Sequence, residues 1–194
     1  LPDFEMITHK FPERQNLTII PISDVHLGAS EHLWNEWEGF CKKVLSSQNT
    51  FITLGGDLIN NGTRSSVSNV FEETIRPRDQ KRMMAEMLKP IRNRILCAVS
   101  GNHERRSGKD ADDDPTYDIL CKLDRENLYR ENMAFLKICM GDQKGCGMQN
   151  PTYCLGITHG AGGGIYGGSG TVSYDASQLT LQGYSQSVGG SWAV

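Results

Sequence analysis

Three short apolar runs, each followed at once by a polar cluster, constrain the fold of this chain more than any other feature. The runs cover 17–22, 50–54 and 95–99 and are rich in β-branched and aliphatic residues, which is typical of buried strands. Between them, 32–47 and 78–94 carry apolar residues at three-to-four-residue spacing, which predicts helices. This alternation indicates an α/β fold built on an open sheet.

Two further helices and two further strands are expected. In chain order they cover much of 65–75, the segment from Asp114 to near Asn127, 133–140 and 152–158. Asp114 followed by Pro115 has the pattern of an N-cap and a first helical position, so we expect a helix to begin there. Pro90 should have the opposite effect and kink or end the helix over 78–94.

The composition indicates one soluble globular domain. The chain has 194 residues, of which 38% are hydrophobic and 22% charged, and its formal net charge of -3 argues against a protein held on nucleic acid by bulk positive charge. The N-terminal residues lack a signal-peptide pattern, and no run reaches the roughly 18 apolar residues of a membrane span. We therefore expect a cytoplasmic protein with no membrane partner, and we interpret its cysteines as reduced.

The last part of the chain differs in composition. From Gly145 to Val194 the only charged residue is Asp175, and 161–194 is dominated by Gly, Ser, Thr, Tyr and Gln. Such a mixture buries little apolar surface and gives few helix or strand signals. We therefore divide the chain into a domain over 1–160 and a low-charge tail over 161–194, where we expect weak order.

Polar side chains with metal-ligand chemistry follow four of the predicted strands. In chain order they are Asp24 with His26, then Asp57, then Asn102 with His103, then His159. An open α/β sheet places its ligands beyond the carboxyl ends of its strands, so these clusters are expected to converge. Carboxylate, imidazole and amide groups without a thiolate suit hard or borderline divalent metals.

Asp57 is a natural bridge between two ions, because its carboxylate has two oxygens. Asp24 and His26 are two residues apart on a chain leaving a strand, where a turn can bring both to one ion. Two ions roughly 3.5–4 Å apart can bind a phosphoryl group, lower the pKa of a bridging water and stabilise the charge that develops during in-line attack. The residues themselves therefore indicate metal-dependent hydrolysis of a phosphate ester.

In their order the four motifs resemble those of the calcineurin-like metallophosphoesterase family: D-x-H, G-D-x-x, G-N-H-[ED] and a later His before Gly. Here they read Asp24-Val25-His26, Gly56-Asp57-Leu58-Ile59, Gly101-Asn102-His103-Glu104 and Thr158-His159-Gly160. Four ordered motifs at strand ends are far more specific than any one of them. The sequence around Asp57 and His159 also resembles the branch of this family that is common in bacteriophages and prophages. That resemblance implies a protein located in the cytoplasm of a bacterial or phage-infected cell.

The resemblance implies a four-layer α-β-β-α sandwich, incomplete at its C-terminal end, and a dinuclear site that hydrolyses phosphate mono- or diesters. By resemblance, Asp24 and His26 would bind the first metal and Asn102 and His159 the second. Asp57 would bridge them, and His103 would be the acid near the leaving group. Manganese is the first expectation for both ions, with iron, zinc, magnesium or nickel as alternatives.

A nuclease is the leading subclass, because relatives in phages would plausibly act on nucleic acid; protein and small-molecule phosphoesters stay open. A basic strip for such a substrate would consist of Lys81, Arg82, Lys89, Arg92 and Arg94. Arg105 and Arg106 could contact a substrate phosphate or form a surface pair. The acidic run over 110–114 could bind a further cation, but such a run is usually a solvated loop.

One family motif is absent. The family completes its metal site with G-H-x-H, whereas His159 is the last histidine of this chain. We expect truncation or a frame shift near Gly164, where the composition changes. Substitution by His9 or His32 and a degenerate relative are the alternatives. A non-catalytic binding module with the same fold is accordingly the alternative function.

Overall fold

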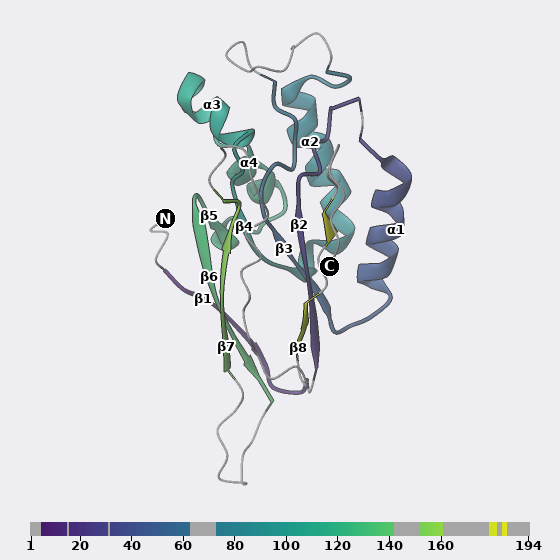
Figure 1. The fold of residues 1–194 in the computed structure, drawn as a ribbon, viewed down its shortest axis with the longest axis vertical. Helices are drawn as coiled ribbons and strands as arrows, with labels where there is room; N and C mark the ends of the chain where they lie inside the picture. Colours follow the sequence, from purple (N-terminus) through teal and green to yellow (C-terminus); the bar gives the residue numbers. More distant parts are fainter. Residues whose placement is uncertain are drawn as a thin grey trace.

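The described residues form two β-sheets and a set of helices (Figure 1). The computed structural model describes residues 5–14, 16–30, 32–62, 73–141, 152–160, 179–181 and 184–185. The α/β class expected from the sequence is confirmed, with parallel and antiparallel strand pairs both present. Five cysteines lie in the described part of the chain, and all five are free thiols.

The larger sheet is parallel throughout its described pairs and has the strand order β5-β4-β3-β2-β8. Its strands are β2 (Leu17–Ser23), β3 (Thr50–Leu54), β4 (Ile95–Val99), β5 (Tyr129–Arg130) and β8 (Leu179–Leu181), and β9 (Tyr184–Ser185) also pairs with β2. Every residue of β3 and β4 is buried. Strands covered on both faces read as continuous apolar runs, which is why these two were visible in the sequence.

The smaller sheet has the order β1-β6-β7 and lies against the larger one at β4. Its strands are β1 (Ile7–Phe11), β6 (Met133–Met140) and β7 (Thr152–Thr158), with β1 parallel and β7 antiparallel to β6. Burial alternates along β6, as expected for a strand with one face on the core. His9 of β1 links the two sheets, because its Nε2 donates a hydrogen bond to the Leu96 carbonyl oxygen at 2.8 Å.

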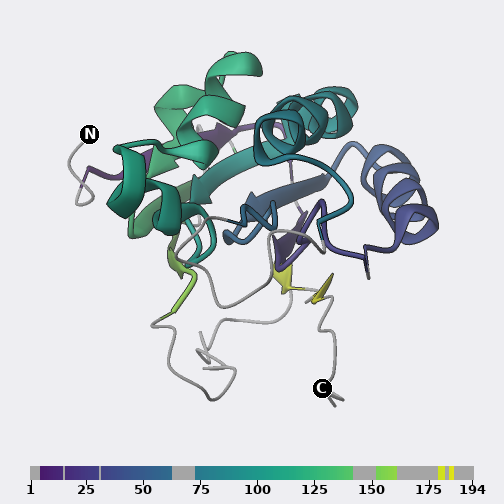
Figure 2. The same ribbon diagram turned by 90° about the horizontal axis from the view of Figure 1, so that it is seen from above.

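The helices lie together on one side of the larger sheet (Figure 2). They are α1 (Trp34–Leu45), α2 (Pro77–Leu88), the 3-10 helix η2 (Lys89–Arg94), α3 (Glu104–Ala111), α4 (Pro115–Lys122) and the 3-10 helix η3 (Glu126–Leu128). None of the helices in the described segments is long and apolar enough to cross a membrane. A second outer helical layer, which a four-layer sandwich requires, is not found among the described residues.

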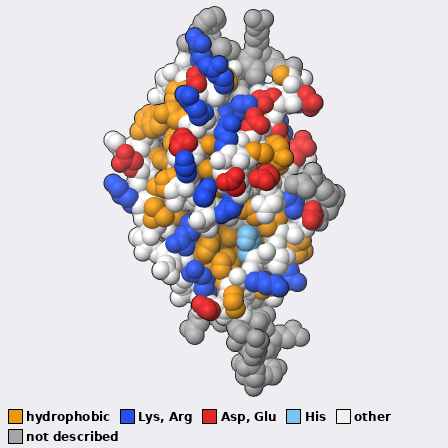
Figure 3. All heavy atoms as spheres, turned by 180° about the vertical axis from the view of Figure 1, so that it is seen from behind, with side chains coloured by type: hydrophobic (Ala, Val, Ile, Leu, Met, Phe, Trp, Pro, Cys, Tyr) orange, Lys and Arg blue, Asp and Glu red, His pale blue; other side chains and the backbone are white. Residues whose placement is uncertain are grey.

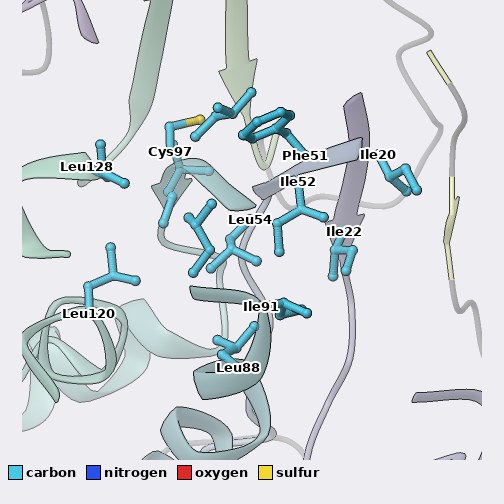
Figure 4. Close-up of a cluster of buried hydrophobic side chains, with 14 of the residues drawn as sticks. Ile20, Ile22, Phe51, Ile52, Leu54, Leu88, Ile91, Cys97, Leu120 and Leu128 are labelled. Carbon is cyan, nitrogen blue, oxygen red and sulfur yellow. The ribbon is translucent and has the colours of Figure 1, made fainter. Parts of the chain in front are cut away.

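The core lies between the strands of the larger sheet and the helices that cover it (Figure 4). Leu54 of β3 and Leu88 and Ile91 of the α2–η2 region are fully buried. Ile138 of β6 belongs to the same cluster, so the smaller sheet shares this core. A single core running across both sheets gives the loops at the sheet edge a rigid support.

Pro90 has the expected effect, since α2 ends at Leu88 and the chain continues as a 3-10 helix. The helix expected over 65–75 is not present at 73–75, and 63–72 lie outside the described residues. The helix that begins at Pro115 ends at Lys122, before a residue with a left-handed backbone, Asp124 (φ 57°). Its N-cap is the expected one, because Asp114 accepts a hydrogen bond from the Tyr117 N–H.

Several elements were not anticipated, among them α3, β1, β5 and β9. The helix α3 has the sequence ERRSGKDA, which offers no apolar stripe, so periodicity could not reveal it. The strand β1 has only partial alternation. The tail over 161–194 lies mostly outside the described residues, which leaves its weak order a prediction, and its described pieces are β8 and β9.

Gly56 provides a test of how closely the loops at the sheet edge approach each other. It has φ +92°, and a Cβ placed there would lie 2.3 Å from the Gly101 backbone nitrogen. We expect Gly56→Ala to lower the free energy of unfolding by at least about 1–2 kcal/mol, because an L-residue is strained in the left-handed region and the clash adds to this cost. Urea unfolding of the metal-free protein would measure the change.

Gly39→Ala is the matched control, because Gly39 lies in α1 with no atom within 4 Å of an added Cβ. Alanine at this exposed helical position should raise the free energy of unfolding by up to about 1 kcal/mol. Equal effects of the two substitutions would contradict the close approach at Gly56.

Candidate metal centre

The loops that follow β2, β3 and β4 meet at one edge of the larger sheet. They carry Asp24 and His26, Asp57, and His103 respectively. Parallel strands end at the same edge, so this convergence follows directly from the strand order. Backbone hydrogen bonds join the first two loops: the Asp24 N–H donates to the Gly56 carbonyl oxygen (3.1 Å), and the His26 N–H donates to the Asp57 carbonyl oxygen (3.0 Å).

Left-handed backbone conformations are concentrated in these loops. Asp24, His26, Asp57 and Asn61 have φ values of 57°, 46°, 51° and 47°. Each such residue costs on the order of 1–3 kcal/mol unless the surrounding structure holds it, and clusters of this kind occur at functional sites. The strain turns side chains from adjacent loops toward a common point.

Asp57 occupies the centre of the cluster, and its side chain is only 4% exposed. One oxygen, Oδ1, accepts a hydrogen bond from the His103 backbone N–H at 2.8 Å. The other oxygen, Oδ2, lies 3.8 Å from His26 Nε2, 3.9 Å from His103 Nε2 and 3.4 Å from His159 Nε2. Oδ1 of Asp57 is therefore occupied by a backbone N–H, whereas Oδ2 faces the Nε2 atoms of the three histidines.

The ligand atoms form two groups that share Asp57. His26, Asp57 and His103 form one group and Asp24, Asp57 and His159 the other, with the ligand atoms of each group within 4.8 Å of one another. Nitrogen and oxygen ligands lie about 2.1 Å from an ion such as Zn²⁺, so two ligands of one ion lie no more than about 4.2 Å apart. The three distances from Asp57 Oδ2 satisfy this limit. The residues present therefore fit divalent ions.

Backbone carbonyl groups orient two of the imidazole rings. The Nδ1–H of His103 donates to the Asn60 carbonyl oxygen at 2.7 Å, and the Nδ1–H of His159 donates to the Gly55 carbonyl oxygen at 2.8 Å. Metal-binding histidines usually make such a bond with the nitrogen that does not hold the ion. In both rings it leaves Nε2 directed toward Asp57.

His159 reaches the centre from the smaller sheet. Its position was expected at the end of a strand in one common sheet, but it follows β7, which pairs with β6. The arrangement of two sheets explains the difference, because the smaller sheet packs on β4 and ends near the same loops. Its Nε2 lies 2.9 Å from Asn102 Oδ1, so the structure also brings the two residues expected at a second ion together.

The same aspartate has opposite effects on two histidines because their surroundings differ. For His159, the hydrogen bond to Asp57 outweighs burial and raises the pKa to about 9. For His103, burial is the largest influence and lowers the pKa, with His26 and Arg106 adding to it against the attraction of Asp57. In the metal-free protein at neutral pH, His159 is thus protonated and His103 is neutral.

The aspartates of the centre are ionised. Burial acts to raise the pKa of Asp57, but hydrogen bonds from His159 and from the His103 N–H, together with the charges of both rings, hold it below its usual value. Burial likewise acts on Asp24, and hydrogen bonds from His26 and Ser23 lower its pKa. Two carboxylates therefore remain available as anionic ligands.

A second layer of residues supports the loops and was missed in the sequence. Gln80 is fully buried, and its Oε1 accepts the Asn61 N–H at 2.9 Å. Asn61 Nδ2 in turn donates to the His103 carbonyl oxygen at 2.8 Å and to Ser107 Oγ at 2.7 Å. Asn tolerates a left-handed backbone, which is the one sequence signal that could have identified Asn61.

Glu104 is the other residue that was missed, although it belongs to the Gly-Asn-His-Glu motif. Its carboxylate is buried and accepts backbone N–H groups of the β3 and β4 loops. Burial raises its pKa to about 7, the charge of Asp57 acts in the same direction, and hydrogen bonds from Ile59 and Asp57 oppose them.

The weaker candidates have other partners. His9 bonds to Leu96 of β4, and His32 Nδ1 donates to the Val25 carbonyl oxygen at 3.0 Å, while neither belongs to the two ligand groups found among the described residues. In the acidic run, Asp113 pairs with Lys81 at 2.9 Å and Asp114 caps α4. These contacts favour a structural role for Asp113 and Asp114.

The two arginines after the motif differ in position. Arg105 NH2 donates to the Ser100 carbonyl oxygen at 2.8 Å, which ties it to the end of β4. Arg106 NH1 lies 3.3 Å from His103 Nδ1, so its charge is placed beside the centre.

The raised pKa of His159 predicts a specific pH dependence in the metal-free protein. We expect its imidazole to titrate near pH 9, well above the ordinary value of 6.5. The interaction with Asp57 therefore stabilises the fold fully below pH 6.5 and is lost as the pH rises through about 9. NMR titration of the imidazole would test the pKa.

The difference in unfolding free energy between wild type and His159→Gln should shrink from pH 6.5 to 9. A difference that stays constant over this range would contradict the pairing of His159 with Asp57.

Comparison with known proteins found no similarity that bears on the function. No family model, no curated protein and no solved structure matches this chain. The residues gathered around Asp57 and their chemistry are therefore the basis for a functional conclusion.

Proposed function

We propose that the protein is a phosphoesterase that hydrolyses phosphate mono- or diesters with two divalent metal ions. The observation that carries this proposal is the shared carboxylate: Asp57 Oδ2 faces three imidazole nitrogens, and two ligand groups have Asp57 in common. A carboxylate shared between two ligand groups can hold two ions close together, as a two-metal hydrolytic mechanism needs. The ordered motifs and the α/β fold support the same conclusion.

Asp24 and His26 with Asp57 would hold the first ion, and Asp57 with Asn102 and His159 the second. This division follows the order of the motifs, and two short distances support it: 3.8 Å between Asp24 and His26, and 2.9 Å between Asn102 and His159. It differs from the two ligand groups described above, which place Asp24 with His159 and His26 with His103. Manganese is the first candidate, and iron, zinc, magnesium and nickel suit the same oxygen and nitrogen ligands. When bound, two such ions bind phosphoryl oxygens, lower the pKa of a water and stabilise the charge of in-line attack.

His103 is proposed as the acid that donates a proton to the leaving-group oxygen. Its Nδ1–H is held by Asn60, so Nε2 is the atom that would gain and donate the proton. Its lowered pKa makes the protonated ring a stronger acid, although that form becomes less populated as the pH rises. Arg106, beside the same ring, would attract the negative charge of the substrate.

The described surface does not favour nucleic acid over other phosphoesters. In the expected basic strip, Lys81 is paired with Asp113 and Asp118, and Arg92 lies 3.4 Å from Asp124. On the face seen in Figure 3, Lys and Arg side chains are interspersed with Asp and Glu side chains. Nuclease activity therefore remains one subclass of the proposal. The four-layer sandwich is likewise proposed as the complete fold.

Metal analysis combined with turnover tests the proposal. The protein would be loaded with manganese, its metal content measured by elemental analysis, and hydrolysis of p-nitrophenyl phosphate and bis(p-nitrophenyl) phosphate followed. Two ions per chain with turnover would support the enzyme, and the preferred ester would define the substrate class. Absence of both would instead favour the non-catalytic binding module.

Asp57→Asn tests the bridge. We expect turnover to be abolished and one of the two ions to be lost, because a neutral amide is a poor ligand between two cations. Elemental analysis and hydrolysis of the same two esters would measure this. Asp124→Asn is the matched control, since Asp124 has a similar φ of 57° and its side chain is 84% exposed. Unchanged turnover in Asp57→Asn would remove Asp57 as the bridge.

His103→Ala tests the acid. The rate should fall by about 10²–10⁴-fold, the usual contribution of general acid catalysis, while metal content falls much less. A leaving group that needs no proton, such as p-nitrophenolate, should be affected less than an alkyl leaving group. If metal content and rate decline in parallel, His103 is a ligand, as its place in one ligand group would also allow.

A further inference from the structure

Glu104, the first residue of α3, makes an unusual set of hydrogen bonds. It is 1% exposed, and its two carboxylate oxygens accept four backbone N–H groups. Oε2 accepts from Asp57 (2.9 Å) and Gly101 (3.0 Å), and Oε1 accepts from Leu58 (2.7 Å) and Ile59 (3.2 Å). Three of the donors lie in the loop after β3 and one in the loop after β4.

The burial of the Glu104 carboxylate is not explained by an ion pair with a neighbouring cation. Within the described segments no ion pair of Glu104 is found, and its hydrogen bonds come from backbone groups of the adjoining loops. A buried carboxylate without hydrogen-bond donors would be very unfavourable. The carboxylate can therefore stay buried only while these backbone N–H groups point at it. Its location at the N-terminus of α3 adds the favourable end of the helix dipole.

The hydrogen bonds of Glu104 lead to Asp57, the residue that belongs to both ligand groups. The Asp57 N–H is one donor, and the backbone there has a left-handed φ of 51°. Asp57 Oδ1 is held by the His103 N–H, one residue before Glu104. A Cβ on Gly101 would lie 2.0 Å from Asp57 Oδ1, which shows how little freedom the carboxylate has.

We propose that Glu104 is the positioning residue of the bridging carboxylate: by holding the backbone of 57–59 against Gly101 it keeps Asp57 Oδ2 directed at the histidines. This inference rests on the proposed dinuclear function, because only a shared ligand needs one of its oxygens placed for two ions at once. Glu104 accepts backbone N–H groups, that of Asp57 included, and therefore acts through the backbone of the loops. A purely structural role would instead lower stability and leave the geometry of the bridge unchanged.

Glu104→Gln is the informative substitution, because glutamine has the same shape but only one acceptor oxygen. Two of the four N–H groups would face an NH₂ group. We expect manganese binding to weaken by about 10–100-fold, the usual effect of removing a residue that orients metal ligands. We also expect loss of the exchange-coupled EPR signal that two Mn²⁺ ions give when they share a bridging ligand. Glu104→Asp keeps the charge and should recover part of both.

Asp114→Asn is the control for stability. Asp114 is also a carboxylate that accepts several hydrogen bonds, from the Tyr117 N–H, Ser100 and Tyr129, but none from the Asp57 loop within the described residues. It should lower thermal stability while leaving manganese affinity and the coupled signal intact. Equal loss of metal binding in this variant would overturn the proposal, as would wild-type affinity and coupling in Glu104→Gln.

Two further measurements keep the outcome decisive. If Glu104→Gln does not fold, Glu104→Asp is compared with the control, and an intact affinity and coupled signal in it would overturn the proposal. If the wild type takes up no manganese, the proposed function fails separately. The hold of Glu104 on the backbone of 57–59 and Gly101 is then tested by amide hydrogen exchange in the metal-free protein. Faster exchange at Asp57, Leu58 and Gly101 in the Glu104 variant supports the proposal, and unchanged exchange refutes it.

Discussion

The contact between the loops that follow β3 and β4 is the constraint on which the rest of the centre depends. Gly56 and Gly101 approach so closely that no side chain fits between the loops, and the Glu104 carboxylate accepts N–H groups from both. Parallel strands deliver the two loops to one edge, so Asp57 and His103 meet through short, rigid connections. The backbone of these two loops is therefore what brings Asp57 and His103 together.

Electrostatic balance follows from this geometry. A nearly buried Asp57 carboxylate faces several imidazoles, and each ring responds according to what else it contacts. His159 bonds through both ring nitrogens and has a raised pKa, whereas His103 lies beside Arg106 and has a lowered pKa. In the proposed metal centre, His159 would therefore have to release a proton before it binds an ion, whereas His103 is already neutral.

Much of the fold could be predicted because its signals are local. Continuous apolar runs identified β3 and β4, and Pro90 marked the end of α2. The helix expected over much of 65–75 is absent at 73–75, and its remainder lies outside the described residues. The prediction missed α3, whose polar sequence begins at Glu104, a residue held by the backbone N–H groups of neighbouring loops. Propensity and periodicity contain no information about such contacts.

The sequence by itself determined the α/β class, the strands β2, β3 and β4 of the larger sheet and the residues with ligand chemistry, because strand length, apolar pattern and residue type are properties of a few neighbouring positions. Only the tertiary structure decided that His159 arrives from a second sheet, that Asp57 uses one oxygen for His103 and the other for the imidazoles, and that Glu104 holds the loop beneath them. Those features join residues 46 to 104 positions apart, and such pairings depend on packing between elements that no local pattern specifies.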